Sequence, residues 1–240
     1  MTNFKLLIVL FIILISSCKN RKPINDNLSK NKSKVEVTEF VKTDCKCFNG
    51  IGSSKGDTAI LTMKFSNGQN ISICGFLDKK MEGIILSEFN VFDCNSGKSL
   101  TEYDATQICR IMEKSDTLII QELKYLPTGK NWTWNLIQIG EQIITTEDKE
   151  ILTAELLPKL EKFTIDDNDI QVFLNSLKKG SGHNSEWELE IGKLETLTLL
   201  GNEKAKSILE NYEEFTGQKT DGALAETWKD AKATTQWIKK

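Results

Sequence analysis

Cysteines are the residues of this sequence with the most evident chemistry. Apart from Cys18, they all lie between residues 45 and 109, as Cys45, Cys47, Cys74, Cys94 and Cys109. In an oxidising compartment, such a cluster predicts a disulfide framework confined to this part of the chain. Side chains two residues apart on an extended segment point the same way, so we expect Cys45 and Cys47 to bond different partners. Five is an odd number, so at least one thiol stays free, and the sequence leaves the connectivity open.

Metal binding is the alternative for the closely spaced pair, since thiolates at this spacing also bind copper or zinc. A zinc ribbon needs a second cysteine pair at similar spacing, which the sequence lacks, and the only histidine, His183, is distant. We therefore expect no metal and no cofactor.

The acidic run of residues 166–169 resembles the start of a calcium loop. Ile170 stands where an oxygen ligand is needed, Gln171 replaces the turn glycine, and Leu177 replaces the bidentate glutamate. Capping of the helix that follows explains the same residues, because acidic side chains favour a helix N-terminus.

Catalytic residues are not predicted anywhere in the chain. His183 lies in a Gly/Ser-rich loop, but no nucleophile motif or carboxylate at a familiar spacing accompanies it. Trp132 and Trp134 would share one face of a strand, where exposed rings stack on sugars or partners and buried rings are core. They are candidate ligand-stacking residues, although core packing is the simpler interpretation.

The first 18 residues have the layout of an export signal. Lys5 precedes an apolar run from Leu6 to Ile15, which is too short to span a bilayer as a helix but suits a signal peptide. The run ends in Ile15-Ser16-Ser17-Cys18, which resembles the lipobox of bacterial lipoproteins. The resemblance covers residues 1–18 only.

This resemblance implies lipidation of Cys18 and cleavage after Ser17. Acyl chains would then hold the protein on a bilayer, because each buried methylene contributes about 0.8 kcal/mol. Lys19 stands where an aspartate would retain such proteins in the inner membrane. The resemblance therefore implies the outer membrane, facing the periplasm, if the cell is Gram-negative; an ordinary secretory signal is the alternative.

Charge is unevenly distributed along the chain. Residues 19–34 carry six basic side chains against Asp26, a net of +5, and have almost nothing to bury. Because the whole chain is at −3 and Lys5 adds one positive charge, the segment from Val35 onward is at −9. A basic tether suits an anionic lipid surface, whereas an acidic body argues against nucleic-acid binding.

The sequence pattern from Asp57 to about Ile144 predicts strands. Asn67-Gly68 is typical of a two-residue hairpin turn joining residues 59–65 to 71–77. Four further strands are expected, at residues 84–92, 106–112, 117–126 and 132–144.

After Thr145 the apolar spacing becomes helical. Leu152, Leu156, Leu160 and Phe163 predict a first helix, interrupted near Pro158. Further stripes begin at Ile170, Ile191, Ala205 and Leu224, and such stripes must be buried against one another or against the sheet.

The expected fold class is α+β, with an N-terminal antiparallel β meander, as a sheet, sandwich or small barrel, followed by a C-terminal α-helical bundle. The expected segments are a signal peptide (1–17), a lipidated tether (18–34), a β domain with the cysteines (35–145) and an α-helical domain (146–240).

Three functions remain open. The first is a non-enzymatic envelope lipoprotein that binds or scaffolds another envelope protein. The second is an envelope hydrolase or carbohydrate-binding protein with a cleft near Trp132 and Trp134. The third is an immunity or inhibitor lipoprotein.

Overall fold

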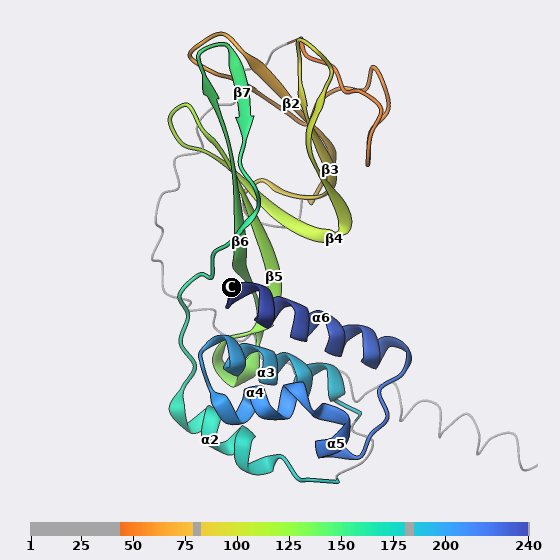
Figure 1. Cartoon of the computed structure of the whole chain (residues 1–240), viewed down its shortest axis with the longest axis vertical. Helices are drawn as coiled ribbons and strands as arrows, with labels where there is room; N and C mark the ends of the chain where they lie inside the picture. Colours follow the sequence, from red (N-terminus) through yellow and green to blue (C-terminus); the bar gives the residue numbers. More distant parts are fainter. Residues whose placement is uncertain (1–43, 79–82, 181–184, 240) are drawn as a thin grey trace, which may run out of the picture. The chain divides into compact units, whose positions relative to one another are not determined.

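Consecutive strands pair in chain order in one antiparallel sheet, as a computed structural model describing residues 44–78, 83–180 and 185–239 shows (Figure 1). The order is β1 to β7, with β8 paired to β6. The strands are β1 (Leu61–Lys64), β2 (Asn70–Leu77), β3 (Ile85–Asp93), β4 (Ser99–Glu113), β5 (Leu118–Pro127), β6 (Trp134–Glu147), β7 (Glu150–Thr153) and β8 (Leu157–Pro158).

The sheet curls into a half-barrel around one apolar core. Its register shifts at Gly75/Phe76 in β2 and at Ser87/Phe89 in β3, where Glu88 has a positive φ of 49°. Such bulges bend a strand and increase its twist. The concave face buries Phe65, Ile73, Phe89, Tyr103, Ile111 and Ile120, among others.

Loop contacts hold the curled sheet at one end. The Asn67 Nδ2 atom donates to the Asp148 carbonyl at 2.9 Å, and the Gln69 Nε2 atom donates to the Lys149 carbonyl at 2.7 Å. These bonds join the β1–β2 turn to the β6–β7 turn. The first turn is not the predicted two-residue type: Phe65 pairs with Gln69, and only Gly68 within it has a positive φ, of 88°.

The first predicted helix is wrong. Residues 150–153 and 157–158 are strands β7 and β8, which pair with β6. The apolar spacing also fits short strands, and the exposed backbone of β6 supplies hydrogen-bond partners that a helix would leave unused.

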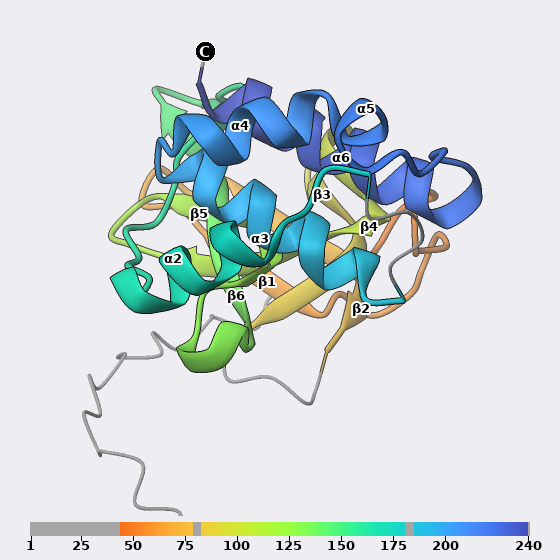
Figure 2. The ribbon, with the colours of Figure 1, turned by 90° about the horizontal axis from the view of Figure 1, so that it is seen from below.

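Helices follow β8 as α2 (Asp167–Ser176), α3 (Trp187–Leu199), α4 (Glu203–Glu210), α5 (Tyr212–Thr216) and α6 (Gly222–Ile238). The predicted fold class is wrong, because the helices of the described part are too few to form a bundle. The fold is instead a curled antiparallel sheet with a few helices at its C-terminal end. Helix α3 contacts β5, α4 and α6, and Figure 2 shows it crossing β5 and β6.

The helices do not pack only against one another, because the hairpin of β5 and β6 reaches into their core. A short 3₁₀ helix (η1, Lys130–Trp132) at its tip places Trp132 in the helical core, edge-on to Phe173 with ring centroids 5.6 Å apart. The apolar stripes of the helices are therefore covered partly by the sheet. Caps define two of these helices: Asp166 accepts from the Asn168 amide at 2.9 Å, and Asn202 accepts from the Ala205 amide at 3.0 Å.

Candidate functional site: a cleft between the sheet and two helices

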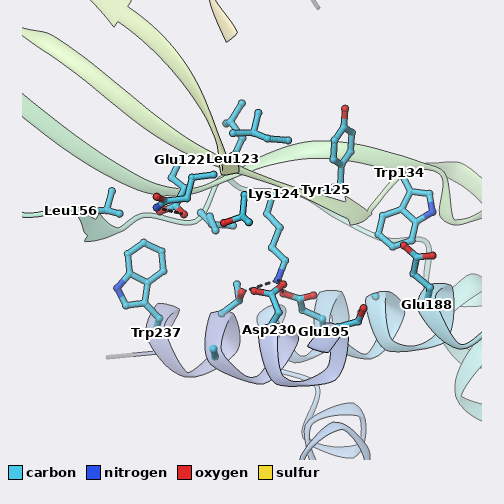
Figure 3. A pocket seen from close by; sticks show the side chains of 18 residues that line it. Glu122, Leu123, Lys124, Tyr125, Trp134, Leu156, Glu188, Glu195, Asp230 and Trp237 are labelled. Carbon is cyan, nitrogen blue, oxygen red and sulfur yellow. Dashed lines mark hydrogen bonds and ion pairs between the residues drawn. The ribbon is translucent and has the colours of Figure 1, made fainter. Parts of the chain in front are cut away.

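A cleft of about 780 Å³ lies between strands β4 to β6 and helices α3 and α6. This volume is within the range of about 300–1,000 Å³ that is typical of ligand sites. We call it the Lys124 cleft, after the side chain at its centre (Figure 3). The side chains that matter most for its chemistry are Glu122, Lys124, Tyr125, Trp134, Glu188, Glu195, Asp230 and Trp237.

Two irregularities of the sheet shape the wall of this cleft. Strand β4 pairs with β3 through Tyr103 and then again through Ile108, so the residues between them leave the ladder. Thr106 and Gln107 of this bulge line the cleft, and Asp104 holds the bulge by accepting from the Thr106 amide at 2.8 Å. The β5–β6 register shifts after Glu122, where the two strands extend towards the helices.

Lys124 connects the sheet to both helices. Its ammonium lies 2.6 Å from the Glu195 carboxylate on α3 and 2.7 Å from the Asp230 carboxylate on α6. It also donates to the Thr234 hydroxyl on α6 at 2.7 Å. An ammonium has three donor positions, so these acceptors satisfy it fully. Lys124 therefore has no free proton-accepting or nucleophilic role in this arrangement.

Glu195 is the buried partner of this network, with 4% of its surface exposed. Burial raises the pKa of its carboxyl above the ordinary value, and the adjacent Lys124 charge opposes that rise. Asp230 is different, because 67% of its side chain is exposed. The strong coupling in the network is therefore between Lys124 and Glu195.

Two tryptophans brace the ends of the cleft, each against a glycine of the opposite layer. A methyl group on Gly192 of α3 would lie 2.7 Å from Cη2 of Trp134, which comes from β6. A methyl group on Gly140 of β6 would lie 2.6 Å from Cη2 of Trp237, which comes from α6. Both contacts are closer than a Cβ atom tolerates, so glycine lets the sheet and the helices approach there.

Aromatic surface remains accessible at one end. Trp134 is 42% exposed although it is a large apolar side chain, whereas Tyr125, which is 43% exposed, projects from the opposite face of β5 (Figure 3). Exposed rings beside a concave surface are typical of binding sites rather than of core packing.

Acidic groups dominate the charge of the cleft. Its lining includes four acidic residues, Glu122, Glu188, Glu195 and Asp230. Among the described residues that line it, Lys124 is the one basic residue, so the formal net charge of the lining is −3. Burial raises the pKa of Glu122, while the Gln107 amide, which donates to it at 3.3 Å, opposes that rise. The cleft thus combines uncompensated negative charge with an exposed aromatic ring.

The two tryptophans predicted as a pair lie in different environments. Trp132 is buried in the helical core, with the Lys193 ammonium 5.2 Å from its ring centroid, and it does not share a strand face with Trp134. The prediction of paired rings is wrong because the chain turns at Asn131 and Trp132, both of which have positive φ. Of these two residues, Trp134 lines the cleft and Trp132 does not.

The predicted disulfide framework is present. Cys45 pairs with Cys94 and Cys47 pairs with Cys74, so the two closely spaced cysteines bond different partners as expected. Cys109 is the free thiol among the described residues and is fully buried in the sheet core. Burial raises the pKa of this thiol well above its ordinary value, which makes it unreactive.

Within residues 44–78, 83–180 and 185–239, no group of three or more His, Cys, Asp and Glu side chains is placed to hold an ion. Asp166 acts as a helix cap. His183 and Cys18 lie outside the described residues.

The sequence interpretation missed most of this cleft. The sequence did indicate that Glu195 is buried, because this residue lies four positions after Ile191 and therefore inside the apolar stripe of its helix. Nothing in the sequence marked Lys124 or Trp237 as part of a site, since a charged residue on a strand and an aromatic residue on an amphipathic helix are both ordinary.

Comparison with known protein families, with curated proteins and with solved structures finds no match for this chain. Within the described residues, no helix is both long enough and apolar enough to span a membrane.

Proposed function

We propose that this chain is a membrane-anchored cell-envelope lipoprotein that binds a segment of another envelope protein in the Lys124 cleft and catalyses no reaction. The observation that carries the binding role is the exposed Trp134 ring on the wall of a cleft of about 780 Å³. Aromatic side chains of this kind are the usual anchors of protein recognition.

Binding is favoured over catalysis by how the polar groups are engaged. Lys124 is satisfied by three acceptors, and Glu195 is tied to it. Neither group is therefore placed as a nucleophile or a general base. The anchoring role rests on the lipobox-like residues ending at Cys18 and on the basic tether that follows them.

Panning of phage-displayed random heptapeptides on the purified full chain tests the binding role. Selected peptides should bind the wild-type chain, and Trp134→Ala should weaken that binding at least tenfold, as expected for an aromatic anchor. Val172→Ala is the matched control, because Val172 is 62% exposed on α2, away from the cleft. Failure to select any peptide that depends on Trp134 would refute the proposal.

A carbohydrate-binding protein is the second candidate, favoured by the exposed Trp134 ring with carboxylates nearby. Indole faces stack on sugar rings, and carboxylates accept bonds from hydroxyl groups. Calorimetric titration with chito-oligosaccharides and dextran oligomers tests this candidate, and binding that survives Trp134→Ala would contradict it.

A further inference from the structure

We propose that the Lys124 cleft recognises basic side chains, arginine above all, in the peptide segment that it binds. This inference rests on the proposed function and specifies its ligand. The cleft joins uncompensated carboxylates to an exposed aromatic ring, and a cation on an extended apolar stem is the ligand that satisfies both features.

The lining of the cleft is acidic. It has a formal net charge of −3, and its one basic residue, Lys124, is already engaged by Glu195, Asp230 and Thr234. Within the described part of the chain, neither Glu122 nor Glu188 forms an ion pair with a lysine or arginine. A bound anion would be repelled here, and a neutral ligand would leave these charges unbalanced.

Partial burial makes the charge of the Glu122 carboxylate costly. The carboxylate is partly desolvated, which raises its pKa, and among the described residues its hydrogen-bond donor is the neutral Gln107 amide. A cation beside it would recover the lost solvation, because opposite charges interact more strongly away from bulk water.

Aromatic rings provide the second feature. Figure 3 shows Glu188 beside Trp134, whereas Tyr125 projects from the opposite face of β5. A guanidinium can stack on an indole face while it donates to a carboxylate, and this cation–π contact is strongest with tryptophan. The close contact of Trp134 with Gly192 of α3 restricts the position of the indole ring.

Of the described carboxylates that line the cleft, the two without an ion pair, Glu122 and Glu188, lie at its opposite ends (Figure 3). Figure 3 shows Glu122 with Leu156 and Trp237 towards one end of the cleft, Glu188 with Trp134 towards the other, and Lys124 between them. Between these two ends, the Glu195 and Asp230 carboxylates are already paired with the Lys124 ammonium. A segment with two basic side chains, one for each end, therefore fits this cleft better than a single compact cation.

Fluorescence anisotropy with three labelled hexapeptide amides tests the proposal on the purified full chain. The peptides differ at two positions, which are both arginine, both citrulline or both glutamate; citrulline keeps the shape of arginine without its charge. We expect the arginine peptide to bind at least tenfold more tightly than the citrulline peptide, and the glutamate peptide not to bind. Added salt should weaken the arginine peptide selectively.

Single substitutions locate the effect. Glu122→Gln and Glu188→Gln should each weaken the arginine peptide about tenfold, which corresponds to 1.4 kcal/mol, and leave the citrulline peptide unchanged. Glu226→Gln is the matched control, because Glu226 is an exposed acid on α6 that does not line the cleft. Thermal unfolding of each variant confirms that it folds.

The binding measurements separate failure of the arginine preference from failure of the proposed function. Equal affinity for arginine and citrulline, or arginine binding that survives both substitutions, overturns this inference while the proposed function stands, provided that panning yields peptides dependent on Trp134. Binding of chito-oligosaccharides with no peptide binding overturns both in favour of the second candidate. Absence of any Trp134-dependent ligand overturns the proposed function itself.

Discussion

Removal of the Lys124 charge gives the sharpest test of how the sheet and helices are joined. In Lys124→Met the aliphatic stem is kept, but the Glu195 carboxylate, 4% exposed, loses its counter-charge 2.6 Å away. The buried acid must then stay charged without a partner or take up a proton. We expect a clear loss of folding stability at neutral pH.

The magnitude follows from the burial of the two partners. Breaking a fully buried ion pair costs about 3–5 kcal/mol, and exposed pairs contribute about 0–1 kcal/mol. The Lys124 side chain is 18% exposed, and its other carboxylate partner, Asp230, is largely exposed, so we take about 2–3 kcal/mol. In a domain of this size that lowers the melting temperature by roughly 4–12 °C.

The pH dependence has a definite sign. The pKa of Glu195 is raised by burial in the folded chain and rises further without Lys124. A carboxyl group with a raised folded pKa loses stability as pH rises from the unfolded value through the folded value. The deficit of Lys124→Met relative to wild type should therefore be small at about pH 4.5 and largest at about pH 7.5.

Urea unfolding followed by circular dichroism measures these free energies at both pH values. Lys206→Met is the control, since Lys206 lies 3.7 Å from an exposed glutamate and should lose less than about 0.5 kcal/mol. The double variant Lys124→Met/Glu195→Leu should recover most of the loss, because it leaves no buried charge. A deficit below about 1 kcal/mol at neutral pH, or one that grows as pH falls, would refute the reasoning.

Three further predictions concern the cysteines and the cleft. In a Cys18→Ser chain, thiol titration should detect no reactive thiol in the native protein and one, Cys109, after denaturation without reductant; a different count contradicts the disulfide pairing. Gly192→Ala should displace the Trp134 ring and shift its resonance in 5-fluorotryptophan NMR spectra, and an unchanged resonance argues against the close contact. Radiolabelled palmitate should enter the wild-type chain in cells but not Cys18→Ala; equal labelling excludes lipidation at that residue.

Local sequence pattern predicted many of the elements. Alternating apolar residues located β2, β3, β5 and β6 to within a few residues, because the pleat of a strand fixes a period of two. Asp166 was identified as a helix cap because three of the residues that a calcium loop needs are absent. Both inferences depend on residues that are close in sequence.

Short apolar runs were less informative. Residues 151–160 carry apolar side chains at a spacing that suits a helix, yet they contain β7 and β8. At this length the two patterns overlap, and the free edge of β6 decided between them.

Contacts between residues that are far apart in the chain could not be predicted from the sequence. The composition indicated that disulfides form, but only the folded chain shows that Cys45 meets Cys94 and that Cys109 is enclosed in the core. Likewise Lys124, Glu195 and Asp230 meet only because β5 extends to α3 and α6.

The sequence by itself therefore determined most of the longer strands, the helix cap at Asp166, the presence of disulfides and the lipobox-like start, because each depends on neighbouring residues or on composition. Tertiary structure decided the half-barrel, the incorporation of Trp132 into the helical core, and the acidic, aromatic cleft. The physical reason is that bulges and turns set the direction of β5 and β6, and these directions fix which side chains from distant segments come into contact.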